Sequence, residues 1–315
     1  MPTASYPPES LVIATRQSAL ALWQAQHVRQ RLHVLYPSCR VDLLGLTTQG
    51  DRRLDQPLAD IGGKGLFVKE LEQALADGRA DLAVHSLKDV PMAMPTGFTL
   101  AAILAREDPR DAFVSNSHPT LASLPPGSVV GTSSLRREAQ LRERHPQLVV
   151  EPLRGNVNTR LHRLDQGNQA AVILASAGLK RLGFGDRITA LLEPEESLPA
   201  VGQGALAVEC RADRIAVVTA LQPLADVETT FATVAERAFG RKLAASCRTS
   251  LAAYAVRRGE KLWLRGFIAS RDGRRVLRGE RSIVVGNVGE AAALGATLGD
   301  EFLERGAMTI LAEAS

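Results

Sequence analysis

The sequence predicts an α/β fold in which parallel-rich sheets are covered by helices, followed by an α+β domain at the C-terminus. Strand-like apolar runs alternate with helix-like segments over the first two-thirds of the chain, a pattern typical of parallel sheets. After about residue 222 the alternation gives way to three longer strand-like runs separated by turn residues, which indicates an antiparallel meander. Because 315 residues exceed what one hydrophobic core usually supports, we expect two or three domains.

The expected elements follow from apolar periodicity and from glycine and proline breaks. In the first part we expect strands at 11–15, 41–47, 81–85, 128–131, 148–152, 170–175 and 204–210, and helices at 18–32, 66–76, 134–144, 157–165 and 178–182. In the last part we expect a helix at 228–243, strands at 251–256, 261–269 and 276–285, and a helix at 290–305. The polar, glycine-rich segment 48–65 is predicted to be a lid, a binding loop or a disordered segment.

Composition excludes several classes of protein. Aromatic residues make up only 4% of the chain, which argues against a binder that stacks nucleic-acid bases. No apolar run approaches the roughly 18 residues of a membrane span, and the first ten residues lack the pattern of a signal peptide. The three cysteines, Cys39, Cys210 and Cys247, form no CxxC pair, so we expect a reducing, cytoplasmic location. No cluster has metal-ligand spacing, and we expect His85 to be a packed strand-end histidine rather than a metal ligand.

Cationic and hydroxyl side chains follow five predicted strands at the point where each strand ends. In parallel α/β sheets, ligands bind beyond these carboxyl ends. The residues concerned are Arg16, Ser18, Lys88, Ser134, Arg136, Arg137, Arg154, Arg160, Lys180 and Arg181. The planar guanidinium group of arginine suits bidentate binding of carboxylate or phosphate, and segment 62–65 lacks the spacing of a nucleotide-binding P-loop. The sequence therefore predicts a site for a small polycarboxylate, although any one of these arginines can also simply solvate a surface turn.

Arg136 and Arg137 stand in the first turn of a predicted helix, where the positive end of the helix dipole makes cations unfavourable. An anionic ligand would offset that cost. Between residues 131 and 163 there are seven arginines and three glutamates, an excess that equals the net charge of +4 of the whole chain. The basic stretch is thus the strongest candidate for an anion site.

Two further residues have both a functional and a structural interpretation. Asp89 is an acid among bases, so it stays ionised and either stabilises a cationic intermediate or orients Lys88 through a salt bridge. Cys247 lies among small residues, and Arg248 would favour its thiolate, but composition alone favours an inert loop thiol. The residues alone leave both alternatives open.

Seven segments together resemble the porphobilinogen deaminase family, also called hydroxymethylbilane synthase. They are IATRQS at 13–18, GGKGLF at 62–67, VHSLKDVP at 84–91, REDPRDAF at 106–113, GTSSLRR at 131–137, LRGN at 153–156 and LPAVGQG at 198–204. The resemblance covers nearly the whole chain. It implies two lobes like those of type II periplasmic binding proteins, with the active site in the cleft between them, and a third domain that carries the cofactor. The implied domains are 1–104 plus 201–222, with a mobile loop at 48–65, then 105–200, and finally 223–315.

The resemblance also implies the reaction and the site. Four porphobilinogen molecules are joined head to tail with release of ammonia, and the linear tetrapyrrole hydroxymethylbilane is freed by hydrolysis. The chain grows on a dipyrromethane cofactor, which by position is attached to Cys247 through a thioether, and Asp89 corresponds to the catalytic aspartate that stabilises the azafulvene cation. The implied cofactor-binding residues are Lys88, Asp89, Ser134, Arg136 and Arg137. The implied substrate-binding residues are Arg16, Ser18, Lys64, Phe67, Arg154, Arg160, Arg181 and Gln203.

The loop around Cys247 departs from the family pattern. Ala245 and Ser246 stand where the family usually has two glycines, and Ala244 stands where it has an acidic residue. Ser250 and Ala252 replace a proline and a glycine after the cysteine. Glycine permits backbone angles that other residues avoid, so these changes bear on how the loop folds and how the cofactor is loaded.

Two other functions compete with this transferase. A non-catalytic two-lobe protein that binds a small anion would explain the arginines, but it needs neither Asp89 nor Cys247. A nucleic-acid binder would use the basic stretch 131–163, but the scarcity of aromatic residues opposes it. We expect a monomer that takes porphobilinogen as its substrate, with no nucleic acid, membrane or metal as a partner.

Overall fold

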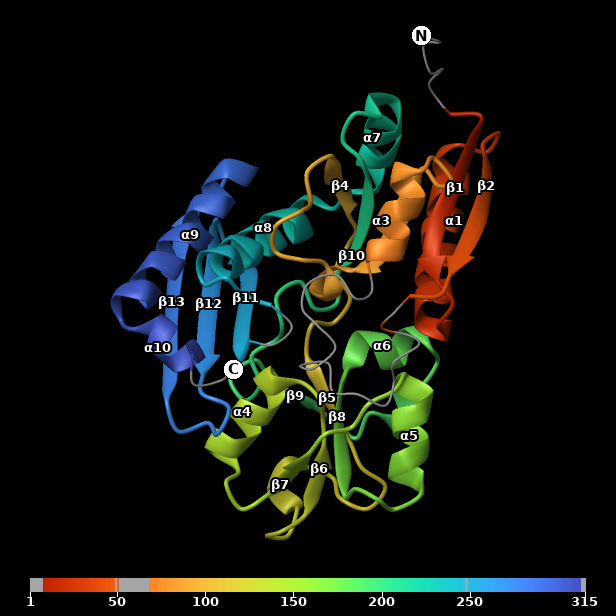
Figure 1. Cartoon of the computed structure of the whole chain (residues 1–315). Coiled ribbons are helices and arrows are strands. Elements are labelled where there is room, and N and C mark those ends of the chain that lie inside the picture. Colours follow the sequence, from red (N-terminus) through yellow and green to blue (C-terminus); the bar gives the residue numbers. More distant parts are fainter. Residues whose placement is uncertain (1–7, 49, 51–67, 247–248, 313–315) are drawn as a thin grey trace. The chain divides into compact units, whose positions relative to one another are not determined.

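The computed structural model describes residues 8–48, 50, 68–246 and 249–312 (Figure 1). Its strands are β1 (Ser10–Arg16), β2 (Arg40–Leu46), β3 (Leu82–Ser86), β4 (Phe98–Ile103), β5 (Asp111–Val114), β6 (Val129–Gly131), β7 (Val149–Glu151), β8 (Ala171–Ala175), β9 (Ala190–Leu192), β10 (Leu206–Arg211), β11 (Leu251–Arg258), β12 (Lys261–Ala269) and β13 (Val276–Val284). Its α-helices are α1 (Ala19–Leu35), α3 (Lys69–Ala76), α4 (Leu135–Arg144), α5 (Val157–Asp165), α6 (Ser176–Arg181), α7 (Ile215–Leu221), α8 (Val227–Lys242), α9 (Val288–Glu304) and α10 (Ala307–Ala312). The strands form three sheets, so the predicted α/β class with a C-terminal α+β part is confirmed.

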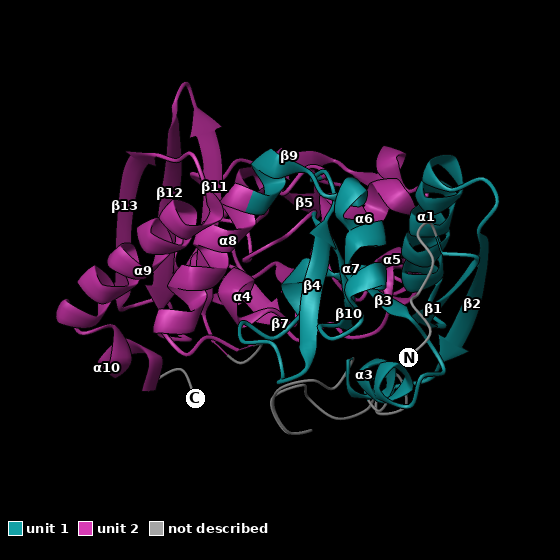
Figure 2. Cartoon of the chain, turned by 90° about the horizontal axis from the view of Figure 1, so that it is seen from above, with its two compact units in different colours: residues 1–106, 205–230 teal, residues 107–204, 231–315 magenta. Residues whose placement is uncertain are grey.

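Contacts divide the chain into two compact units (Figure 2). Unit 1 comprises residues 1–106 and 205–230, and unit 2 comprises residues 107–204 and 231–315. Unit 2 holds two of the three sheets. The division into three domains that the sequence suggests stays a prediction.

The sheet of unit 1 has the strand order β2-β1-β3-β10-β4. As predicted, β1 is parallel to both β2 and β3. Strand β10 returns from far along the chain and lies antiparallel between β3 and β4. Apolar side chains fill both faces: Leu11, Ile13 and Val28 belong to the core beneath α1, while Leu71 and Ala83 belong to the core beneath α3.

The first sheet of unit 2 has the order β7-β6-β8-β5-β9. Strand β6 is parallel to β7 and β8, whereas β5 is antiparallel to β8 and β9. Leu141 of α4 packs on one face beside Ile173, and Leu161 of α5 packs on the other beside Val172. Alternation of strands and helices did not predict β4, β5 and β9, because β5 and β9 are short, with 4 and 3 residues, and all three pair with strands distant in the sequence.

The C-terminal sheet, β11-β12-β13, is an antiparallel meander, as predicted. Helix α9 runs along this sheet in Figure 1 and contacts β12 and β13. Phe239 of α8 and Phe302 of α9 meet edge to face, with ring centroids 4.9 Å apart. A Cβ atom at Gly266 of β12 would lie 2.6 Å from the Phe239 ring, so glycine is needed there for the aromatic pair to reach the sheet.

Candidate active site

Asp89 lies on a short 3-10 helix, η1 (Leu87–Asp89), directly after β3 in unit 1. Leu87 and Val90, on either side of the Lys88-Asp89 pair, are buried, and the Leu87 N–H donates to the Ala205 carbonyl at 3.0 Å. Lys88 is half-buried and Asp89 is exposed. The turn therefore fixes its own backbone and presents the Asp89 carboxylate to solvent, as a residue that meets a ligand requires.

Arg16 and Ser18 lie at the end of β1 and the start of α1, as predicted, and both are half-buried. The Ser18 hydroxyl oxygen caps the helix by accepting from the Ala21 N–H at 3.4 Å. The buried Thr15 hydroxyl donates to the Ala21 carbonyl at 3.1 Å. These bonds hold the strand-to-helix turn from which Arg16 extends.

Arg136 and Arg137, in the first turn of α4, share one buried carboxylate, that of Asp111 at the start of β5. Both arginines are buried, with exposures of 4% and 6%, and Asp111 is fully buried. Arg136 donates from both Nη atoms, at 2.8 and 3.1 Å, and Arg137 donates from Nε and Nη2, at 3.1 and 2.7 Å. The sequence suggested that an anionic ligand offsets the two positive charges at the start of α4. In the structure the Asp111 carboxylate is the anion at this place.

Ser197 and Gln203 complete the shell around Asp111. The Ser197 hydroxyl donates at 2.8 Å and the Gln203 amide at 2.9 Å. Burial alone would raise the pKa of Asp111, but the two guanidinium groups outweigh burial and hold that pKa well below its usual range. Burial also lowers the pKa of Arg136. One carboxylate facing two guanidinium groups leaves a net positive charge in the interior.

Sequence reasoning missed Asp111, although the residue lies inside the quoted segment 106–113. The sequence feature that could have revealed Asp111 is an acidic residue directly before the apolar run Ala112-Phe113-Val114. An acid at such a position is buried with the strand and therefore needs a cationic partner. Arg136 and Arg137 are that partner, but they lie 25 and 26 residues away along the chain.

The remaining predicted arginines of unit 2 lie at loop-to-helix junctions. Asn156 caps α5 by accepting from the Thr159 N–H at 2.9 Å, and the Arg160 Nε donates to the Gly155 carbonyl at 2.9 Å. Gly155 has a φ of 107°, and a Cβ atom there would lie 2.8 Å from Thr159. Arg154 and Arg160 are both half-buried.

Arg181, at the end of α6, is also half-buried, and its Nη2 donates to the Gly204 carbonyl at 2.7 Å. Burial lowers the pKa of Arg181, and Glu107 opposes that shift. Lys64, Phe67 and Cys247, which the resemblance assigns to the site, lie outside the described residues.

The donors of unit 2 fit a ligand that carries carboxylates. Ser134 caps α4 by accepting from the Arg137 N–H at 3.4 Å. Two buried polar atoms beside it, the Ser133 hydroxyl oxygen and the Arg136 Nε, have no hydrogen-bond partner within the described ranges. Guanidinium and hydroxyl groups are the donors that carboxylates prefer. The side chains present are thus compatible with a dipyrromethane bearing acetate and propionate groups.

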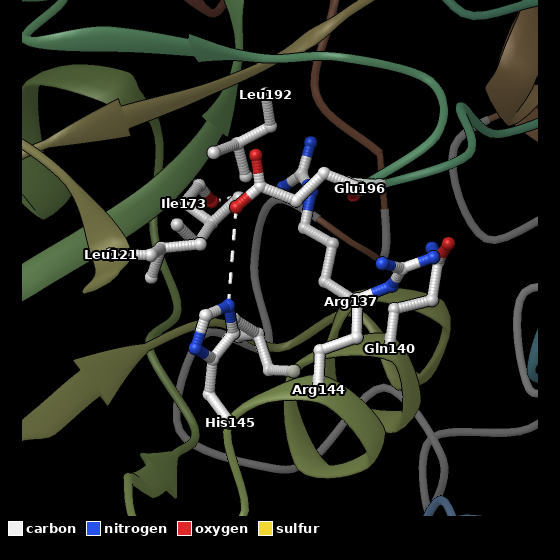
Figure 3. Close-up of a pocket in the computed structure, with 10 residues that line it drawn as sticks. Leu121, Arg137, Gln140, Arg144, His145, Ile173, Leu192 and Glu196 are labelled. Carbon is white, nitrogen blue, oxygen red and sulfur yellow. Dashed lines mark hydrogen bonds and ion pairs between the residues drawn. The ribbon is translucent and has the colours of Figure 1, made fainter.

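A small cavity lies beside Arg137 (Figure 3). Gln140, Arg144, His145 and Glu196 are among the residues that line it, and the imidazole of His145 lies 3.9 Å from the Glu196 carboxylate. Its volume of about 10 Å³ has room for roughly one water molecule. The cavity is too small for a pyrrole and is separate from the predicted binding residues other than Arg137.

Comparison with known proteins identifies the family. The family model "Porphobilinogen deaminase, dipyromethane cofactor binding domain" matches residues 11–219, and "Porphobilinogen deaminase, C-terminal domain" matches residues 230–304. The chain belongs to the porphobilinogen deaminase family. It is 60% identical over 309 residues to a porphobilinogen deaminase of Paraburkholderia phytofirmans, covering 98% of this chain and 90% of the relative. It is 59% identical over 312 residues to one of Ralstonia nicotianae, covering 99% and 93%.

Solved structures resemble this member of the porphobilinogen deaminase family only at low sequence identity. A periplasmic substrate-binding protein of an ABC transporter from Coxiella burnetii matches with a TM-score of 0.42 and 12% identity, covering 67% of this chain and 91% of that one. The periplasmic VFT2 domain of BvgS from Bordetella pertussis matches with a TM-score of 0.41 and 16% identity, covering 68% and 86%.

The loop before Cys247 contains one residue in the left-handed backbone region that glycine favours. This residue is Ala244, and it precedes the two positions at which the family usually has glycine. Ala244 has a φ of 49°, and among the described residues it is the only non-glycine with a positive φ. The Ala245 N–H bonds to the Gly240 carbonyl at 2.9 Å, which closes the end of α8. Ala244 therefore bears the strain that glycine would relieve.

Ala244→Gly is expected to raise the free energy of unfolding by about 0.5–1 kcal/mol, because a left-handed cap residue is strained when it has a Cβ atom. Urea unfolding measures the change. Ala292→Gly, in the interior of α9, is the control and should destabilise the protein, since glycine is a poor helix former. A loss of stability in Ala244→Gly would contradict the strain at Ala244.

Proposed function

We propose that this chain is a hydroxymethylbilane synthase that joins four porphobilinogen molecules head to tail, releases ammonia, and frees the linear tetrapyrrole by hydrolysis. The observation that carries the proposal is that the two family models together span the strand-end residues and the Asp89 turn. The matches support this transferase and lend no support to a non-catalytic anion-binding protein. No helix within the described residues is long and apolar enough to cross a membrane.

Asp89 would serve the chemistry because its carboxylate is exposed on a turn whose flanking residues are buried. Loss of ammonia leaves positive charge on the substrate pyrrole, and a fixed carboxylate stabilises that charge and accepts a hydrogen bond from the ring N–H. Lys88, beside Asp89, would bind a carboxylate of the cofactor. The proposed roles of Asp89 and Lys88 are both electrostatic. They need the η1 turn to keep its conformation during the reaction.

The cationic residues would hold the acetate and propionate groups. In this proposal Ser134, Arg136 and Arg137 serve the cofactor, whereas Arg154, Arg160, Arg181 and Gln203 of unit 2, and Arg16 and Ser18 of unit 1, serve the substrate and the growing chain. Lys64 and Phe67 are proposed to contribute from the loop that precedes α3. When bound at Cys247, dipyrromethane would supply the pyrrole carbon to which the first porphobilinogen is added. The proposed enzyme is cytoplasmic and monomeric, and it has the three domains that the family resemblance implies.

Intact-mass measurement tests the proposed attachment. The purified protein should carry an adduct of two pyrrole units, and Cys247→Ser should lack both the adduct and the activity, because the thioether needs the cysteine sulfur. Cys39→Ser is the matched control, since Cys39 is buried in the unit 1 core and should leave the adduct in place. An active wild-type protein with an unmodified mass would overturn the assignment of the cofactor to Cys247.

A further inference from the structure

A buried acid and a buried histidine meet beneath the turn that carries Asp89. The imidazole Nε2 of His85, on β3, lies 2.8 Å from the Oε2 of Glu209, on β10. The side chains are 5% and 0% exposed. The other carboxylate oxygen of Glu209 is buried and has no hydrogen-bond partner among the residues described. His85 is therefore the hydrogen-bond partner that the described residues offer this buried carboxyl group.

The pairing of β3 explains why this contact matters. Strand β1 pairs only with the first two residues of β3, Leu82 and Ala83. Strand β10, on the other side of β3, pairs with all five residues from Leu82 to Ser86, so in the second half of the strand β10 is the pairing partner that remains. The end of the strand that leads into η1 thus depends on β10 for its position.

Two other bonds in the same place also join segments that are far apart in the sequence. The Leu87 N–H binds the Ala205 carbonyl, and the Gln24 amide donates to the Ser86 hydroxyl at 2.7 Å. On the far side of β10, the register with β4 shifts between Val208 and Glu209. The side-chain bond between Glu209 and His85 adds a further tie to the regular backbone pairing of β10 with the end of β3.

We propose that His85 and Glu209 form a positioning pair that fixes the Lys88-Asp89 turn for the reaction. This inference rests on the proposed function, since it assigns the pair to the same turn. A buried hydrogen bond is stronger than one in water, and an amide at position 209 would change the donors and acceptors of the pair, so the natural pair restrains the strand end more tightly. A misplacement of catalytic groups by about 1 Å can cost about 100-fold in rate without loss of binding.

The charged groups packed against the pair come from α3. Helix α3 contacts both β3 and β10, and Glu72 on this helix interacts electrostatically with His85, Glu209 and Lys69. Burial raises the pKa of Glu72, and the neighbouring Glu209 raises it further, while His85 and Lys69 lower it. Within the described part of the chain Glu72 makes no hydrogen bond to His85, so it offers a matched control in the same layer.

Glu209→Gln tests the pair, with kcat and KM for porphobilinogen measured on cofactor-loaded protein whose adduct is confirmed by mass. We expect kcat to fall about 10- to 100-fold while KM stays within about twofold, because binding groups remain and only the turn shifts. Glu72→Gln, which makes the same chemical change beside the pair, should leave kcat within about twofold of the wild type. An unchanged kcat in Glu209→Gln, even with a lower melting temperature, overturns the proposal.

His85→Phe takes the place of Glu209→Gln if the latter does not fold, since it removes the ring nitrogen that bonds to Glu209 while keeping a planar ring, and it is expected to give the same separation of kcat from KM. If both single variants fold, the double variant should be no slower than either, because residues that act as a unit are not additive. Additive losses would overturn the pair. Synthesis of hydroxymethylbilane by the wild type is measured in the same experiment, so failure of the proposed function is distinguished from failure of this inference.

Discussion

Asp89→Asn is expected to lower kcat by about 100- to 1,000-fold, because it removes a charge placed where positive charge develops on the substrate. The residue is exposed, so the fold and its stability should be unaffected. Release of ammonia from porphobilinogen measures the rate, and intact mass shows whether the cofactor is present. Loss of turnover in a loaded, folded protein would assign the charge to the chemical step.

Asp186→Asn is the matched control for this change. Asp186 is also exposed and also lies on a 3-10 helix, η3 (Gly185–Arg187), but it is not among the residues assigned to the site. Its activity should equal that of the wild type. Turnover of Asp89→Asn within about threefold of the wild type would contradict the electrostatic role.

Asp111→Asn is expected to destabilise the protein by about 3–5 kcal/mol, because it leaves two buried guanidinium groups without their counter-ion. The four hydrogen bonds from Arg136 and Arg137 would face an amide that accepts with only one oxygen. Urea unfolding measures the loss. Cofactor loading, read by mass, should fall as well, since both arginines are proposed to hold the cofactor.

The pH dependence of stability reports the same network. Asp111 has a pKa below its ordinary value of 3.8, so its contribution is present above that value and is lost as the pH falls toward the lower folded pKa. The wild type should lose stability as the pH falls below about 4, and Asp111→Asn should lose less over that range. The double variant Asp111→Asn with Arg137→Met should lose less free energy of unfolding than the sum of the losses in the two single variants. A cost below about 1 kcal/mol for Asp111→Asn would refute the network.

Local sequence predicted most of the architecture, because strand ends and helix starts leave local signals. Ser18, Ser134 and Asn156 each cap a helix at the place where a serine or asparagine follows a strand. The strand-end cations and Asp89 were found in the same way, whereas Lys64, Phe67, Gln203 and the role of Cys247 came from the resemblance alone. Their family assignments came from the resemblance, and their individual roles stay predictions.

Contacts between residues that are far apart in the sequence could not be predicted from local patterns. Asp111 and Glu209 lie in apolar strands, and their partners are 25 to 26 and 124 residues away. Strands β4, β5 and β9 are also defined by partners distant in sequence. The left-handed backbone falls at Ala244 and not at Ala245 or Ser246, because the end of α8 and not the family pattern decides which residue takes it.

The return of β10 to the sheet of unit 1 constrains the order in which the chain can fold during synthesis. In the described sheet β4 pairs only with β10, which is made about 100 residues later. At a translation rate of about 5–20 residues per second, β4 waits for roughly 5–20 s with an unpaired edge. The continuous segment 107–204 meanwhile emerges complete with all five strands of its own sheet. A nascent chain stopped near residue 204 would therefore hold a finished second sheet and an unfinished first one, so the turn that carries Asp89 is among the last parts of the molecule to be set in place.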